Sequence, residues 1–203
     1  MIVEVPAGAA RVSLRRVSEG AVGDVVGHLL AANDQWLVLL PEDRPAVWVP
    51  RAEAESIRTV PERTVLPVSR PDDVERALQR MRPAARRARL GGWWLTDAVT
   101  LAIGDPGMPL DEAVAAVEGW SGAPARVRCV ADGPVAAFAE MDLRVRHTTV
   151  VLTADADPAG RPGAVPLTRG WALDIDSTDV EALAAAVAAG FTQRYRTVTM
   201  TRP

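Results

Sequence analysis

Five short apolar runs lie between residues 10 and 60, and turn-forming residues separate them. Val12 and Leu14 alternate with polar residues, which is typical of a strand with one buried face. Asn33 and Asp34 lie between two runs, as in a tight hairpin. We expect strands at residues 10–17, 25–30, 36–40, 46–49 and 57–60, with a helical turn over 50–53. Because closure removes exposed sheet edges, this pattern predicts a small all-β barrel over residues 1–60.

The pattern changes after residues 61–70, which contain prolines and are expected to form a linker. Val74, Leu78 and Met81 follow helical spacing and predict a helix over residues 71–81, with Ser69 and Asp72 near its start. Further helices are expected at 110–120, 135–141 and 180–189, and strands at 93–103, 125–130, 144–153, 165–175 and 192–201. Residues 155–163 are expected to be a loop. The fold class is therefore α+β, with an α/β domain over residues 71–203.

Composition removes several classes of function. The 203 residues carry a net charge of −3, which gives no general attraction to nucleic acid or anionic membranes. All 23 basic residues are arginine, so mechanisms that need a catalytic lysine are excluded. No apolar run is long enough for a membrane span, and the N-terminus carries no recognisable secretion signal, so we expect a cytoplasmic protein.

The sequence predicts no metal site. Cys129 is the only cysteine, which excludes an intramolecular disulfide and a multi-cysteine zinc site. His28 and His147 are far apart in the chain and fit no ligand spacing. We expect Cys129 and the two histidines to be structural.

Asp174 and Asp176 follow an apolar strand, as the two aspartates of haloacid-dehalogenase-type phosphatases do. That chemistry also needs a distal lysine and an acidic magnesium site, and only 25 residues follow Thr178. The favoured interpretation is a cap for the helix at 180–189, with Thr178 and Glu181 as a capping box.

Two side-chain sets are candidates for binding. Arginines gather within 14 residues and could hold phosphates or an acidic partner, or could form internal ion pairs on a solvated helix. Aromatic residues in a small barrel can form a peptide-binding groove, although we expect Trp93 and one of Trp36 and Trp48 to be core. The arginines are Arg76, Arg80, Arg82, Arg86, Arg87 and Arg89.

Two longer motifs carry a family resemblance. The runs LGGWWL (90–95) and LAIGDPGMPLDEAVAAVEGW (101–120) resemble actinobacterial N-acetyltransferases of the GNAT family, whose mycobacterial members are described as histone acetyltransferases. In that family an SH3-like barrel precedes the GNAT region. The resemblance covers about 140 residues, from Arg11 onward, and implies acetyl-CoA as cofactor and an amine of a protein or small molecule as substrate.

The chain also departs from that family. We find no copy of the Arg/Gln-x-x-Gly-x-Gly/Ala loop whose amides hold the acetyl-CoA pyrophosphate. Residues 86–92 (RRARLGG) have its composition without its spacing, and the GNAT-like region is shortened. The chain therefore looks like a degenerate enzyme, and its trimmed domain could leave an apolar face open for a homodimer.

Three hypotheses follow. The first is a GNAT-related, non-catalytic binding or regulatory module. The second is an active N-acetyltransferase, for which Asp105, Asp111 and Glu140 are candidate bases. Tyr195 lies near the position where such enzymes often place a tyrosine acid. The third is an adaptor whose barrel binds a peptide or nucleic acid through Trp36 and Trp48.

Overall fold

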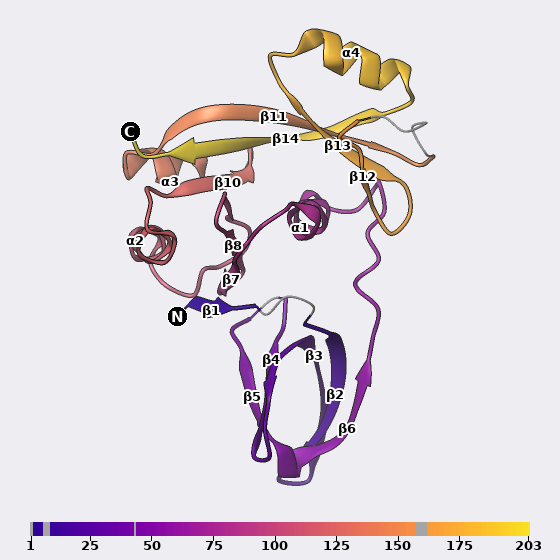
Figure 1. Cartoon of the computed structure of the whole chain (residues 1–203), viewed down its shortest axis with the longest axis vertical. Coiled ribbons are helices and arrows are strands. Elements are labelled where there is room, and N and C mark those ends of the chain that lie inside the picture. The colour runs from indigo at the N-terminus through magenta and orange to yellow at the C-terminus, as the bar shows by residue number, and fades with distance from the viewer. Residues whose placement is uncertain (1, 6–8, 43, 157–161) are drawn as a thin grey trace.

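The computed structural model describes residues 2–5, 9–42, 44–156 and 162–203. Figure 1 shows a small all-strand unit joined to a larger unit of strands and helices. The small unit, called here the N-terminal unit, is a five-stranded antiparallel sheet in the order β5-β4-β3-β2-β6. Its strands are β2 (Arg11–Ser18), β3 (Ala21–Ala32), β4 (Trp36–Leu40), β5 (Val47–Pro50) and β6 (Ala54–Thr59).

Local sequence explains this unit well. Val12, Leu14 and Leu39 belong to a buried core of its own. Asn33 forms the expected turn, because its Oδ1 accepts hydrogen bonds from the amides of Gln35 and Trp36 at 2.9 and 2.7 Å. The predicted helical turn is a short 3₁₀ segment over Arg51–Glu53.

The larger unit is built on a nine-stranded sheet in the order β1-β7-β8-β9-β10-β14-β11-β13-β12. β9 and β10 are parallel, and every other neighbouring pair is antiparallel. Its strands are β1 (Ile2–Glu4), β7 (Arg87–Leu90), β8 (Trp93–Thr96), β9 (Thr100–Leu101), β10 (Arg126–Val130), β11 (Arg144–Ala154), β12 (Val165–Pro166), β13 (Trp171–Asp176) and β14 (Thr192–Thr201).

Four helices cover this sheet. α1 contacts the side of the sheet that carries Val151 and Tyr195. The other helices pack against the opposite side of the sheet. α2 and α3 share a core with Val198, and α4 shares a core with Val150. α1 and α4 lie on opposite sides of β11 and β14 in Figure 1. The helices are α1 (Pro71–Met81), α2 (Leu110–Ser121), α3 (Val135–Glu140) and α4 (Val180–Ala188).

The α+β class is confirmed, and the chain differs from the expected layout in four places. The strand expected over 165–175 is two strands, β12 and β13, separated by residues 167–170. β1 pairs with β7 in the large sheet, although residues 1–60 were expected to form one barrel. β7 was not expected, and the strand predicted over 93–103 is two strands separated by a turn. These strands depend on pairing with distant partners, which local periodicity does not encode. Of the loop expected at 155–163, residues 157–161 lie outside the described residues.

Candidate functional site

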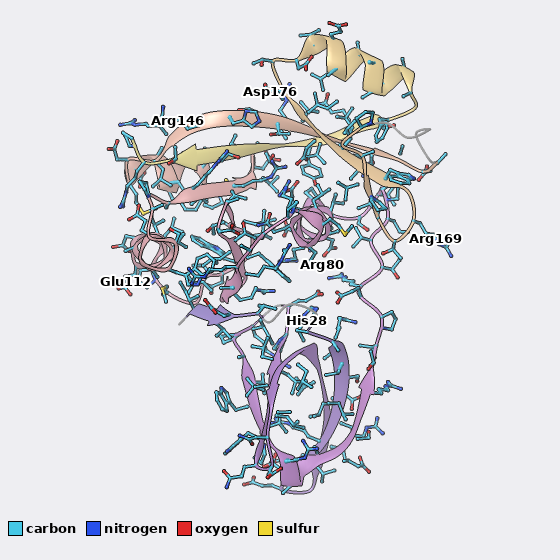
Figure 2. All side chains as sticks on the ribbon, viewed as in Figure 1. His28, Arg80, Glu112, Arg146, Arg169 and Asp176 are labelled. Atoms are coloured by element: carbon cyan, nitrogen blue, oxygen red, sulfur yellow. The ribbon has the colours of Figure 1, made fainter. Side chains whose placement is uncertain are left out.

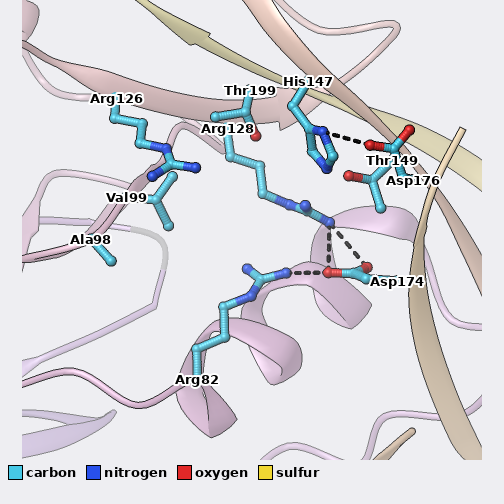
Figure 3. A pocket seen from close by; sticks show the side chains of 10 residues that line it. All are labelled: Arg82, Ala98, Val99, Arg126, Arg128, His147, Thr149, Asp174, Asp176 and Thr199. Carbon is cyan, nitrogen blue, oxygen red and sulfur yellow. Dashed lines mark hydrogen bonds and ion pairs between the residues drawn. The ribbon is translucent and has the colours of Figure 1, made fainter. Parts of the chain in front are cut away.

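A polar pocket of about 260 Å³ lies against the large sheet, where the C-terminal end of α1 leaves the strands uncovered. In Figure 3, Arg126, Arg128 and His147 extend from the sheet, and Arg82 approaches from the end of α1. The lining residues are Arg82, Ala98, Val99, Arg126, Arg128, His147, Thr149, Asp174, Asp176 and Thr199.

Strand alternation brings these polar side chains to one face. Val127 and Cys129 enter the apolar core, so Arg126 and Arg128 point to the other side of β10. Arg128 lies opposite Thr199 on β14, and Thr199 lies opposite His147 on β11. A register shift between Val145 and His147 places His147 rather than Arg146 in that row. Irregularities of this kind re-aim side chains beside binding sites.

A buried ionic network forms the floor of the pocket. Glu75 on α1 has no solvent exposure and accepts from Arg128 Nε at 2.8 Å and Nη2 at 3.1 Å. Arg128 Nη2 also donates to Asp174 Oδ1 at 3.1 Å, and Arg82 Nη2 donates to Asp174 Oδ2 at 2.6 Å. Burial opposes the charge of Arg128, but Glu75 and then Asp174 outweigh it and raise the pKa of Arg128. The guanidinium is therefore held in place as a cation.

Tyr195, the acid expected from its position, belongs to the same network. Its hydroxyl donates to Glu75 Oε1 at 3.1 Å. Burial, followed by the negative charge of Glu75, raises the pKa of Tyr195 far above its ordinary value. The phenol therefore stays protonated and stays bonded to Glu75, and Tyr195 is not among the residues that line the pocket.

His147 and Asp176 form a pair at the rim of the pocket. His147 Nδ1 lies 3.0 Å from Asp176 Oδ2, and both side chains are partly exposed. Because a carboxylate only accepts hydrogen bonds, Nδ1 carries the proton and Nε2 is left as the acceptor of the neutral ring. Hydrogen bonds from the Thr178 hydroxyl and then its amide lower the pKa of Asp176, with a smaller contribution from His147.

Arg126 differs from the other two arginines of the pocket. It is exposed on β10 and has no ion pair or hydrogen bond to any side chain in the described part of the chain. Arg128 and Arg82 are already paired with carboxylates. The pocket therefore offers one free guanidinium and the hydroxyls of Thr149 and Thr199 as donors. These groups suit the binding of a carboxylate or phosphate group.

The two aspartates of the pair do not form the helix cap that the sequence predicted. Asp174 and Asp176 both line the pocket, and the N-cap of α4 is Asp179, whose side chain accepts from the Ala182 amide at 2.9 Å. The Thr178–Glu181 capping box is therefore wrong: the Thr178 hydroxyl donates to Asp176 Oδ1 at 2.7 Å.

The six arginines of the predicted set lie in four different parts of the structure. Arg82 enters the pocket, while Arg87 donates to the carbonyls of Gln79 and Arg82 at the end of α1. Arg86 is exposed, bonds to Glu4 and lies over the Trp120 ring. Arg76, Arg80 and Arg89 lie at the contact with the N-terminal unit, where their charges interact.

The remaining candidates lie away from the pocket. Glu140 is exposed at the end of α3. Trp93 is core as expected, but the expectation that Trp36 or Trp48 is core is wrong, because their exposed fractions are 38% and 59%. Their rings form an edge-to-face pair with centroids 6.3 Å apart. Burial raises the pKa of Cys129 to about 11, so its thiol is protonated and buried.

Three residues of this site escaped the sequence analysis: Glu75, Arg126 and Arg128. The signal for the last two was the alternation Arg-Val-Arg-Cys-Val, which puts two charges on one face of a central strand. Such charges need partners or a ligand. Glu75 gave a weaker signal, because one turn of helix separates it from Leu78 and it shares the buried stripe.

The described residues contain no group of three or more His, Cys, Asp or Glu side chains placed to hold a metal ion. None of the described helices is long and apolar enough to cross a bilayer. The chain matches no protein-family model, no curated protein and no solved structure.

Proposed function

We propose that this protein is a binding module related to GNAT N-acetyltransferases that takes a small carboxylate- or phosphate-bearing molecule in the polar pocket and does not transfer acetyl groups. The observation that carries the proposal is the free guanidinium of Arg126 beside the fixed, ion-paired guanidinium of Arg128. Arg128 is held there by Glu75 and Asp174, so the pocket is preorganised before a ligand arrives.

The start of α2 does not fit an acetyl-CoA pyrophosphate. The helix follows the GDPG motif, where such an anion would need free amides and a positive helix end. Pro106 and Pro109 have no N–H, and the Gly107 amide already donates to Asp105 Oδ1 at 2.7 Å. Asp111 and Glu112 add two negative charges to the first turn. A diphosphate would be repelled there, which supports a module without this cofactor.

Calorimetric titration tests the proposal. We expect phosphoserine to bind, and we expect Arg126→Gln to weaken that binding at least about tenfold, the effect of losing one charge-assisted hydrogen bond. Arg144→Gln is the control, since Arg144 is exposed and pairs with Asp142 outside the pocket. Acetyl-CoA should give no heat. Acetyl transfer to an amine would overturn the non-catalytic assignment, and absence of phosphoserine binding at millimolar concentration would overturn the pocket assignment.

The exposed tryptophan pair favours a second candidate function. Trp36 on β4 and Trp48 on β5 lie together on the surface of the N-terminal unit. Exposed aromatic rings can receive proline-rich segments in extended form. This supports the hypothesis of an adaptor that binds a peptide through the N-terminal unit. Quenching of tryptophan fluorescence by a decaproline peptide, lost in Trp48→Ala, would support it, and unchanged fluorescence at millimolar peptide would reject it.

A further inference from the structure

Arg89 is a buried cation at the contact between the two units. Only 1% of its surface is exposed. Its Nη2 donates to the carbonyls of Glu42 at 2.9 Å and Gly91 at 3.2 Å, and the guanidinium lies 4.5 Å from the centroid of the Trp94 ring. Its Nε has no hydrogen-bond partner, and no described carboxylate forms an ion pair with it. An unpaired buried charge is costly, so this arrangement needs a physical reason.

No carboxylate among the described residues serves as a counter-ion to Arg89 without also facing another arginine. Burial, and then the positive charge of Arg76, lower the pKa of Arg89 to about 10, with Arg80 adding to the effect and Glu42 opposing it. Arg89 is still charged at neutral pH. Glu42 lies 4.0 Å from Arg11 and is shared with it.

The other two carboxylates of this contact are also shared. Glu62 binds His28 at 2.9 Å and lies 3.8 Å from Arg80, and His28 and Arg80 face each other across the contact in Figure 2. Asp73 lies 3.1 Å from Arg63 and 3.7 Å from Arg76. Among the described residues of this contact, five arginines thus share three carboxylates, and these residues together carry an excess of positive charge.

Arg89 also lines a cavity of about 110 Å³ between the two units. Leu40, Pro45 and Ala46 of the N-terminal unit form one side. Gly91 and the turn at Pro106 and Gly107 form the other. A water molecule occupies about 30 Å³ of liquid, so the cavity has room for a small ion of four or five heavy atoms.

We propose that this cavity binds a phosphate-type oxyanion through the Arg89 guanidinium, and that the bound anion fixes the N-terminal unit against the large sheet. The anion would supply the counter-charge that the shared carboxylates leave missing. The cavity has no lining residue in common with the polar pocket, so this proposal goes beyond the proposed function and does not depend on it.

Thermal unfolding with inorganic phosphate as the probe tests the proposal, at constant ionic strength set with sodium chloride. The melting temperature of the wild-type protein should rise saturably, by about 3–5 °C at ten times the dissociation constant. Arg89→Met should abolish the rise and should be at least as stable as wild type without phosphate, because the unpaired charge is gone. Arg86→Met removes an exposed arginine three residues away and should keep the rise.

Two further variants test the cavity independently of Arg89→Met and separate it from the polar pocket. Ala46→Leu narrows the cavity from the N-terminal unit and should reduce the phosphate effect even if Arg89→Met does not fold. Because the polar pocket would also bind phosphate under the proposed function, the Arg89 and Ala46 variants are compared in the Arg126→Gln background, where the phosphate effect that remains reports the Arg89 cavity alone, and failure of one proposal is distinguishable from failure of the other. No saturable shift in the Arg126→Gln protein, or a shift in Ala46→Leu and Arg89→Met as large as that seen without these substitutions, would overturn the oxyanion site.

Discussion

Glu75 is a buried carboxylate on which the charge of Arg128 depends. It receives two hydrogen bonds from Arg128 and one from Tyr195. Glu75→Gln removes the negative charge and leaves Arg128 buried with only Asp174, so we expect a loss of about 3 kcal/mol in the free energy of unfolding. Urea unfolding measures it, and Glu140→Gln on the exposed end of α3 should stay within about 0.5 kcal/mol. Equal stability of Glu75→Gln and wild type would contradict the role of Glu75.

Thr178 controls the ionisation of Asp176. Its hydroxyl gives the largest of the interactions that lower the pKa of Asp176. Thr178→Val removes that hydroxyl with little change of shape, so the pKa of Asp176 should rise toward its ordinary value. Thr178→Ser keeps the hydroxyl and should keep the lowered pKa. Carboxyl carbon chemical shifts followed by NMR against pH measure both, and identical titrations of the two variants would remove this assignment.

At the residue scale, sequence reasoning singled out Asp174, Asp176 and His147, but it favoured a helix cap for the aspartates and a structural role for His147, and it did not bring them together. Asp176 joins His147, 29 residues away along the chain, only because β13 pairs with β11 in one register and β11 is irregular after Val145. A shift of one residue would turn every side chain of the strand to the other face. Register of this kind depends on distant strands, so the site was not predictable from local patterns.

Helices were predicted more accurately than strands, for physical reasons. α1 and α2 agree with the expected ranges within one residue, because periodicity and end signals lie within the helix itself. β1, β7 and β12 are short and owe their existence to a partner strand. The cap of α4 was placed at Thr178 rather than Asp179 because both residue types favour that position.

The backbone conformation and close packing of the turn before β8 favour glycine at position 91. At Gly91, φ is +54°, and an added Cβ would lie 2.5 Å from the Asp105 carbonyl oxygen and 2.5 Å from the Pro106 carbonyl carbon. Gly122 after α2 also has a positive φ, of +71°, but no atom within 4 Å of an added Cβ. Replacement of either glycine by alanine should cost about 1–2 kcal/mol in the free energy of unfolding, because alanine disfavours a left-handed backbone.

Comparison of the two glycine variants separates backbone strain from a steric clash. Gly91→Ala must also push two backbone segments apart, so we expect it to cost about 1–3 kcal/mol more than Gly122→Ala in chemical denaturation. Equal losses would show that the turn at Asp105 and Pro106 yields without cost. The close packing of this turn then would not explain why glycine stands at position 91.

The described parts of the chain form two sheets with separate cores. Val12, Leu14 and Leu39 pack only within the N-terminal unit, and no described residue of that core belongs to the cores of the large sheet. Polar contacts join the units, such as the Arg89 guanidinium with the Glu42 carbonyl, and the His28 ring lies edge-on to the Trp94 ring. Polar contacts of this kind couple folding units less strongly than a continuous apolar core does.

Leu39→Ala should therefore destabilise the N-terminal unit and leave the stability of the larger unit unchanged. Leu39 is fully buried, and its truncation should cost about 2–5 kcal/mol within the N-terminal unit. Hydrogen exchange should rise across residues 11–59 and stay near wild-type values across β10, β11 and β14, whose core does not include Leu39. Phe138→Ala, which removes a buried ring that packs on Trp93, should give the opposite pattern. A uniform rise over both units in either variant would mean that the polar contact, including the cavity at Arg89, binds the two cores into one cooperative structure.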